Sequence, residues 1–256
     1  MIGSDVNEFK KIKNKDLPPL LLDVSKRAGK AIGDYAMIQE GDKIAVAVSG
    51  GKDSISLLHV LRHRQSLAPI NFEFAAVHID FEFEDFNPAK LIEYFEQHGF
   101  TYHVEKVDAM KGERWEDIEC FWWSKNRRKA LFEFADKNGF NKIAFGHHLD
   151  DIVETILLNQ FYRAEIGAMR PNQPMFDGKL NIIRPLAYER EENMRLLADE
   201  LGIQSIGGQS KCANDETSHR MLIKKMLRDF EKDNPQIMKN IFNSVKNVKA
   251  EYLLNT

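Results

Sequence analysis

The sequence lacks any long apolar run. None of its hydrophobic stretches approaches the ~20 consecutive apolar residues that a membrane-spanning helix needs. Its first residues, MIGSDVNEFKKIKNKDLPP, also lack the apolar segment of a secretory signal peptide. Cysteine is scarce as well, and two cysteines in 256 residues do not make a disulfide framework. These absences predict a cytoplasmic protein that is held together by an ordinary hydrophobic core.

An excess of positive charge is missing too. The formal net charge is −3 at pH 7, which argues against a protein that is basic over its whole surface. Nucleic acid is still a permitted partner, because binding needs only one basic face. The sequence has no internal repeat and no low-complexity tract, and its 43% hydrophobic and 29% charged residues are typical of a globular chain. We therefore expect one large domain, with or without helical additions.

Apolar segments of two kinds alternate along the chain. Short β-branched runs predict strands and segments with helical spacing predict helices, an order typical of an α/β fold with a doubly wound parallel sheet. We expect strands at 44–48, 72–80, 101–107, 142–146, 180–185 and 203–206, helices at 20–37, 55–61, 87–98, 116–137, 147–161, 191–201, 217–230 and 234–252, and a long loop at 167–179. The predicted divisions are a lysine-rich arm at 1–20, a ligand-binding domain at 21–212 and a C-terminal helical extension at 213–256.

The stretch KIAVAVSGGKDSISLLHVL at 43–61 joins the first predicted strand to a helix through a glycine loop. Two consecutive glycines let the backbone turn tightly and approach a ligand closely, because no Cβ intrudes. The helix N-terminus that follows offers unpaired N–H groups to an anion. A plain turn would explain the glycines, but not the serines, lysine and aspartate around them. The loop therefore predicts phosphate binding by Ser49, Gly50, Gly51, Lys52 and Ser54, with Asp53 able to hold magnesium.

A second polar motif, FGHHLDDIVET at 145–155, follows the fourth predicted strand. It should face the same crevice as the glycine loop and Asp80, because ligands in such sheets bind at the carboxyl ends of the strands. Its histidines and aspartates either bind metal or act as cap and surface residues, and a cap suits Asp150 at a helix start. A zinc site would need further ligands at matching spacing, and none is evident nearby. From the residues alone, both interpretations stay open.

Each cysteine has basic neighbours. Cys120 precedes a helix segment that contains Arg127 and Arg128, and Cys212 follows Lys211. A lone cysteine is by default a small buried hydrophobe, whereas a neighbouring cation would stabilise a reactive thiolate. The sequence alone leaves both interpretations open.

Basic residues gather on two predicted helices. After Cys212, the spacing of Arg220, Lys224 and Arg228 places them on one helix face, as phosphate binding would need. The alternative is a solvated face that is balanced by neighbouring acids. The position of both clusters beside the cysteines favours an RNA-binding surface made of Arg127, Arg128, Arg220, Lys224 and Arg228.

The motifs together resemble a known family. SGGKDS is not the GxxxxGK[ST] loop of ordinary P-loop ATPases, but it resembles the pyrophosphate loop of the PP-loop ATP pyrophosphatases. GHHxDDxxET is similar to the second signature of their tRNA-modifying members. From residue 26 to residue 252 the chain resembles the tRNA 2-thiocytidine synthetase group, through stretches that include SKNRRKALFEFA, KIAFGHHLDDIVETILLNQFY, IIRPLAYERE and IKKMLRDFEKDNP.

This resemblance implies a HUP-like fold and an enzyme that adenylates a tRNA cytidine with ATP and then replaces oxygen by sulfur, releasing AMP and pyrophosphate. The partners it implies are a tRNA or another RNA, a sulfur donor (a cysteine desulfurase or sulfide) and a second copy of the chain. It implies ATP contacts at the glycine loop and at His78, Asp80, Gly146 and His147, magnesium at Asp53 and Asp151, and catalysis by Cys120, Cys212, Asp53, Asp150 and Asp151.

Family members hold a [4Fe-4S] cluster on three cysteines, and this sequence departs from that pattern. Cys120 and Cys212 match the first and the third, but Trp123 stands at the second, and Gln209 stands where an extra cysteine often occurs. Two thiolates are a poor complement for a cubane cluster. Three hypotheses remain: a cluster with a non-cysteine ligand, a persulfide relay between the two cysteines, and loss of thiolation. The rivals for the whole protein are a PP-loop enzyme that adenylates another nucleophile or a small molecule, and an ATP-binding module without turnover.

Overall fold

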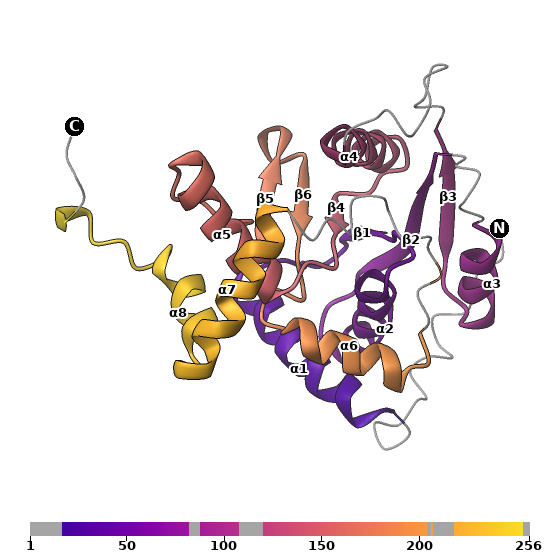
Figure 1. Ribbon diagram of the computed structural model, residues 1–256. Helices are drawn as coiled ribbons and strands as arrows, with labels where there is room; N and C mark the ends of the chain where they lie inside the picture. The colour runs from indigo at the N-terminus through magenta and orange to yellow at the C-terminus, as the bar shows by residue number, and fades with distance from the viewer. Residues whose placement is uncertain (1–16, 82–87, 108–119, 204–205, 207–217, 253–256) are drawn as a thin grey trace.

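The computed structural model describes residues 17–81, 88–107, 120–203, 206 and 218–252, and within them six strands form one sheet (Figure 1). The strands are β1 Lys43–Ala47, β2 Glu73–Asp80, β3 Tyr102–Lys106, β4 Lys142–Ala144, β5 Asn172–Met175 and β6 Leu180–Ile183. Their order across the sheet is β3-β2-β1-β4-β6-β5. Neighbouring strands run parallel except at the edge, where β5 is antiparallel to β6.

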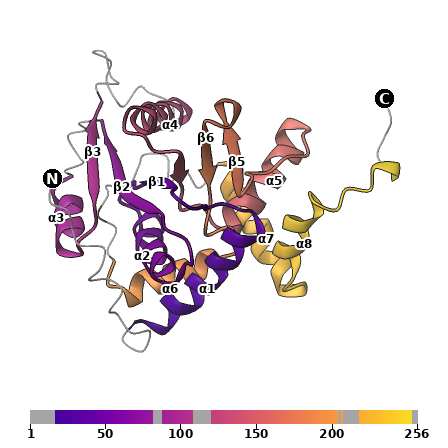
Figure 2. The same ribbon diagram turned by 180° about the vertical axis from the view of Figure 1, so that it is seen from behind.

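Helices cover both faces of the sheet. Ile44, Ala45 and Val46 on β1 are therefore all fully buried, as in a parallel strand that is covered on both sides. α1, α2 and α6 pack together on one face, and α4 lies across the other (Figure 1 and Figure 2). This arrangement confirms the predicted doubly wound α/β class. The helices are α1 Pro19–Asp34, α2 Lys52–Leu67, α3 Ala89–Gln97, α4 Cys120–Lys137, α5 Leu149–Arg163, α6 Glu191–Glu200, α7 His219–Asp233 and α8 Ile237–Ser244.

A separate apolar cluster joins α5, α7 and α8 beside the sheet. Ile152 and Ile156 of α5 pack there with Ile223 and Leu227 of α7 and with Phe242 of α8. Burial of each such side chain contributes about 1.5–3 kcal/mol. The cluster therefore fixes α7 next to α5, although the two helices are far apart in the sequence.

The strand order reverses between β1 and β4. The chain passes from β1 outward to β2 and β3, and it returns to form β4 on the other side of β1. Open parallel sheets bind ligands at such a switch point, outside the carboxyl ends of the strands. The glycine loop follows β1 and the second motif follows β4, so the fold brings both to this position.

The prediction of a loop without regular structure at 167–179 is wrong. The segment contains β5 and a 3₁₀ turn at Phe176–Gly178. Its sequence did not look like a strand because it contains Pro174, which cannot donate to a sheet ladder. An edge strand tolerates proline, since one of its sides has no partner strand.

Of two further predicted elements, one helix is wrong in its extent and one strand lies partly outside the described residues. The helix predicted at 234–252 is interrupted: α8 ends at Ser244, before the weak helix formers Val245 and Asn247, and a 3₁₀ turn forms only at Ala250–Tyr252. The described ends of the predicted strand at 203–206 are not in a strand. Ile206 instead donates its amide to the carbonyl of Gly50, at 3.1 Å.

The division of the chain at residues 20 and 212 stays a prediction. Among the described helices, none combines the length and the apolar character that crossing a bilayer would require.

Candidate functional site

The glycine loop joins β1 to α2 in a compact turn. Gly50 has a φ of 84°, in the left-handed region that favours glycine. Ser54 donates its hydroxyl to the carbonyl of Gly51 (2.8 Å) and accepts a hydrogen bond from the amide of Ser49 (3.3 Å). α2 then begins without a side-chain cap, so the amides of its first turn are available to an anion in front of the loop. This is the arrangement that phosphate binding needs.

Lys52 and Asp53 carry the charges of the loop. The ammonium of Lys52 lies 3.1 Å from Oδ2 of Asp53. Oδ1 of Asp53 is buried and has no hydrogen-bond partner within the described part of the chain. A buried carboxylate oxygen is costly unless a positive charge or a donor compensates it. This atom therefore fits a divalent cation that the phosphates would share.

Gly146 is the point where the second motif meets the glycine loop. A Cβ atom at this position would lie 3.0 Å from the backbone carbonyl carbon of Asp53, 3.1 Å from its oxygen and 3.1 Å from the amide nitrogen of Ser54. Backbone atoms in a packed interior cannot move aside as the tip of a side chain can. Any other residue would therefore displace the start of α2. The two motifs form one site.

The end of β2 supports the loop from the side. Nδ1 of His78 lies 2.8 Å from the carbonyl oxygen of Val48, so the ring donates its proton there. Burial lowers the pKa of His78. Asp80 is the last residue of β2 and is also buried. The structure thus places both residues at the predicted edge, and their contact with ATP stays a prediction.

The two histidines of the second motif have different surroundings. Burial, together with arginines from α4, α7 and the end of β6, lowers the pKa of His147 to about 4 against the opposing effect of Asp151. The ring is therefore neutral at pH 7, and its Nδ1 has no hydrogen-bond partner within the described residues. His148 precedes α5, and its backbone amide donates to Oδ2 of Asp151 at 3.0 Å.

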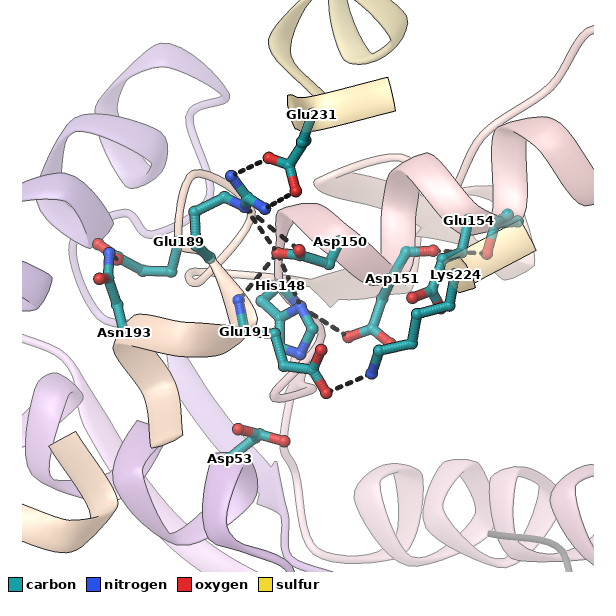
Figure 3. Close-up of polar contacts among 12 residues, drawn as sticks. Asp53, His148, Asp150, Asp151, Glu154, Glu189, Glu191, Asn193, Lys224 and Glu231 are labelled. Carbon is teal, nitrogen blue, oxygen red and sulfur yellow. Dashed lines mark hydrogen bonds and ion pairs between the residues drawn. The ribbon is translucent and has the colours of Figure 1, made fainter. Parts of the chain in front are cut away.

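Asp150 ties the start of α5 to the start of α6. Its carboxylate accepts hydrogen bonds from Nε of Arg190 (3.2 Å) and from the amide of Glu191 (2.8 Å). Arg190 also holds Glu231 of α7 with its two terminal nitrogens, at 2.7 and 3.0 Å (Figure 3). The geometry gives Asp150 a bracing contact, and its predicted part in catalysis stays a prediction.

Asp151 and Glu154 share one arginine. Arg220 of α7 donates to Oδ1 of Asp151 at 3.1 Å and to Oε2 of Glu154 at 2.6 Å. Burial would raise the pKa of Asp151, but both neighbouring histidines and Arg220 outweigh burial, so the pKa is lowered. Burial raises the pKa of Glu154. The structure therefore keeps Asp151 ionised and hydrogen-bonded on both of its oxygens.

A cavity of about 390 Å³ extends from the glycine loop to α6 and α7. Lys224 spans part of it and binds Glu191 at 2.5 Å (Figure 3). Its wall contains both positively and negatively charged side chains, so the cavity as a whole is not suited to bind an anion alone. The lining residues that carry charge are Lys52, Asp150, Glu154, Arg190, Glu191, Glu192, Arg195, Lys224, Arg228 and Glu231.

The five residues predicted to bind RNA do not share one environment. Arg127 is half-buried, 6.0 Å from the ring of Phe81. Arg128 is exposed and forms no ion pair within the described ranges, while Arg228 is exposed at the rim of the cavity. Arg220 and Lys224 are committed to carboxylates of α5 and α6. Their predicted role in RNA binding stays a prediction.

The predicted sulfur chemistry falls largely outside the described residues. Cys212 lies there entirely, and of Cys120 only its place as the first residue of α4 is described. Within the described residues, no group of three or more His, Cys, Asp or Glu side chains is arranged to hold a metal ion.

Sequence reasoning missed two arginines of the site. Arg184 follows β6 at the same edge of the sheet, is buried, and donates to the carbonyl of Arg170. The available signal was its place near the carboxyl end of the strand predicted at 180–185. Arg190 left no such signal, because its partners Asp150 and Glu231 are distant in the sequence.

Comparison with known proteins finds a matching family model, similar sequences and a structure of the same fold. The family model described as a PP-loop domain matches residues 21–227. A tRNA-cytidine(32) 2-sulfurtransferase of Geotalea uraniireducens is 36% identical over 91% of this chain and 94% of its own length, and one of Alcanivorax borkumensis is 39% identical over 95% and 87%. The solved structure of the U34-tRNA thiolase NcsA from Methanococcus maripaludis, with its [4Fe-4S] cluster, aligns with a TM-score of 0.70 and 19% identity, covering 90% of this chain and 80% of that one, and thus has the same fold.

Proposed function

The chain belongs to the PP-loop family and to the group within it that contains the tRNA-cytidine(32) 2-sulfurtransferases, and from this premise we propose that it thiolates a cytidine of tRNA at the expense of ATP. The ATP-dependent half of this reaction is supported by the position of Gly146, which lies so near the backbone of Asp53 and Ser54 that a Cβ atom would not fit. It joins both family motifs into one phosphate-binding crevice at the switch point of the sheet.

In the first step, the oxygen on the cytosine ring attacks the α-phosphorus of ATP, and the bond to the β-phosphate breaks. Pyrophosphate leaves and the base is adenylated. The glycine loop and the first amides of α2 are suited to hold the departing pyrophosphate, with the ammonium of Lys52 beside them. These groups are fixed before the reaction, so they stabilise the developing charge without rearrangement.

Magnesium is the ion that this crevice would hold. The fit is supported by the buried, unpartnered Oδ1 of Asp53, and the ionised carboxylate of Asp151 is the second proposed ligand. When bound, magnesium neutralises phosphate charge during the displacement. Asp53 and Asp151 would orient it through their carboxylate oxygens.

In the second step, sulfur attacks the activated ring carbon, the carbon–oxygen bond breaks and AMP leaves. Two thiolates are a poor complement for a cubane cluster, so this step is derived through thiols alone. One of Cys120 and Cys212 accepts a sulfane sulfur from a persulfide donor, such as a cysteine desulfurase, and its terminal sulfur bonds to the base. The other thiolate then attacks the carrier sulfur, which frees the thiolated base and leaves a disulfide that a dithiol must reduce.

The remaining partners follow from this chemistry. The RNA contact is assigned to the exposed Arg128 on α4 and Arg228 on α7. We place the reaction in the cytoplasm, where tRNA and reduced thiols are available, and a second copy of the chain is included as a proposed partner.

The test is the release of AMP and pyrophosphate from labelled ATP in the presence of a persulfide donor and a dithiol, with and without unmodified tRNA. The proposal expects both products only when tRNA is present. ATP binding without pyrophosphate release on any tRNA would instead identify a module without turnover. Release that depends on a small molecule rather than on RNA would identify the rival adenylating enzyme. For the sulfur step, thiolation by the Cys120→Ser variant would contradict the assigned relay.

A further inference from the structure

One side chain of α7, Arg220, contacts two acids of α5 that belong to the second motif. Arg220 lies in the first turn of α7 and donates to Asp151 at 3.1 Å and to Glu154 at 2.6 Å. The two acids lie three positions apart on α5, on one face of that helix. The side chain of Glu154 is 6% exposed and that of Asp151 is 22% exposed. Glu154 is thus the inner anchor of the guanidinium, and Asp151 is its neighbour on the open side.

The remaining contacts leave Asp151 little freedom. Its Oδ2 accepts the backbone amide of His148 at 3.0 Å, so the two oxygens are held by donors from two different elements. α7 is itself held against α5 by the buried side chains of Ile223 and Leu227. The ring of His219, next to Arg220, stacks on Tyr162 of α5 with centroids 3.9 Å apart. The packing of α7 on α5 therefore fixes the backbone position of Arg220.

We propose that Arg220 is a positioning residue for the magnesium–ATP complex and not an RNA contact. It orients the carboxylate of Asp151 toward the crevice while leaving lone pairs on both oxygens for the ion. This inference rests on the proposed ATP chemistry of the site. It departs from the interpretation of Arg220, Lys224 and Arg228 as one phosphate-binding face.

The charges around Arg220 support this choice over RNA binding. A phosphate of the RNA would meet a guanidinium whose charge two carboxylates already balance, one of them almost fully buried. An arginine is also the side chain that fits the task, because its planar fork can bind two acids at once. Lysine has one nitrogen and cannot reproduce both contacts in the same geometry.

The experiment compares Arg220→Gln and Arg220→Lys with the wild-type protein. Binding of a non-hydrolysable ATP analogue is measured without RNA by calorimetry over a series of Mg²⁺ concentrations, and tRNA affinity is measured separately by filter binding. Loss of a group that orients a metal ligand typically weakens metal affinity by about 10–100-fold. We expect Arg220→Gln to raise the Mg²⁺ concentration for half-saturation by about tenfold, with partial rescue by Arg220→Lys and tRNA affinity within about twofold of wild type.

Lys225→Gln is the matched control, because Lys225 is exposed on the same helix and lies outside the contacts described for the crevice. It should leave the Mg²⁺ dependence unchanged. Far-UV circular dichroism and the melting temperature show whether each variant folds, and Arg220→Lys decides the test if Arg220→Gln does not fold. An unchanged Mg²⁺ dependence together with a tenfold loss of tRNA affinity would overturn the inference. Failure of the wild-type protein to bind the magnesium–ATP analogue would instead overturn the proposed function.

Discussion

α4 and α7 carry the same kind of sequence signal, basic residues at helical spacing, yet the fold uses them differently. α4 packs on the sheet through apolar side chains, among them Leu131 and Phe134, and Arg128 stays exposed without an ion pair in the described ranges. α7 also buries apolar residues, but its Arg220 and Lys224 meet carboxylates of α5 and α6. The comparison teaches that the partners of a helix's basic residues depend on the acids of neighbouring helices. Those acids cannot be read from the sequence of the helix itself.

The largest effect on the difference between α4 and α7 is expected from a substitution that distorts the ATP crevice beside α7. Gly146→Ala places a methyl group 3.0–3.1 Å from backbone atoms of Asp53 and Ser54. Such overpacking costs about 1–3 kcal/mol, which corresponds to roughly a tenfold to hundredfold loss of ATP affinity if the cost falls on the loop. tRNA binding through α4 should be unchanged. Titration calorimetry with ATP checks the first expectation and filter binding the second.

Gly33→Ala is the control for this variant, because within the described residues no atom beyond the local helix backbone lies within 4 Å of a Cβ at Gly33 in α1. Alanine in a helix is favoured over glycine by up to about 1 kcal/mol, so ATP affinity should be retained. Equal losses in both variants would contradict the role assigned to Gly146.

A second substitution tests whether ion pairs that hold α7 contribute to the stability of the protein. Arg190→Gln leaves Asp150 and Glu231 without their shared cation, and we expect the free energy of unfolding to fall by about 1–3 kcal/mol. Chemical denaturation measures this change. Arg195→Gln removes only an exposed pair with Asp199 and should cost less than about 1 kcal/mol. Comparable costs would show that α7 is not braced through Arg190.

A third substitution tests whether the exposed Arg128 of α4 binds tRNA. Arg128→Gln should weaken tRNA binding by roughly threefold to tenfold and reduce the salt slope of log K by about one, because one phosphate contact is lost. ATP affinity should stay the same. Lys129→Gln, which removes an exposed pair with Glu133, is its neighbour control. If Arg128→Gln weakened ATP binding and spared tRNA, the division of labour between α4 and α7 would be reversed.

The smallest expected effect is a change in the pKa of His147 when an arginine is removed. Arg128 of α4 and Arg220 of α7 both lower this pKa. The pKa of His147 is lowered from 6.5 to about 4, so the unfolded chain takes up a proton that the folded protein excludes. Stability therefore falls as the pH is lowered through the window from 6.5 to 4. Removing Arg128 or Arg220 should raise the pKa of His147 and narrow that window. NMR titration of the imidazole checks the direction, and an unchanged pKa in both variants would contradict it.

The sequence predicted the fold class and the glycine loop because both depend on local patterns. Apolar β-branched runs and the six residues of SGGKDS lie within single segments, and Gly50 adopts the positive φ that the loop required. The edge strand β5 was missed because Pro174 hides it, and only its pairing with β6 makes it a strand.

The ion pairs of the site could not be predicted for a different reason. Arg190 joins Asp150 to Glu231, and Arg220 joins Asp151 to Glu154, so each bridge connects segments distant in the chain. The spacing of Arg220 and Lys224 identified a common face, but not the acids that the fold places opposite it. The alternative of a face balanced by neighbouring acids describes these two residues better than a free phosphate-binding face.

The most direct test of the account is the nucleoside composition of the tRNA after reaction. Unmodified tRNA is incubated with the protein, ATP, Mg²⁺, a persulfide donor and a dithiol, then digested and analysed by mass spectrometry. The account predicts a cytidine in which sulfur has replaced oxygen, formed only with ATP and absent when Lys52→Met protein is used. Release of pyrophosphate with a product that carries no sulfur would contradict it and assign the crevice to another nucleophile.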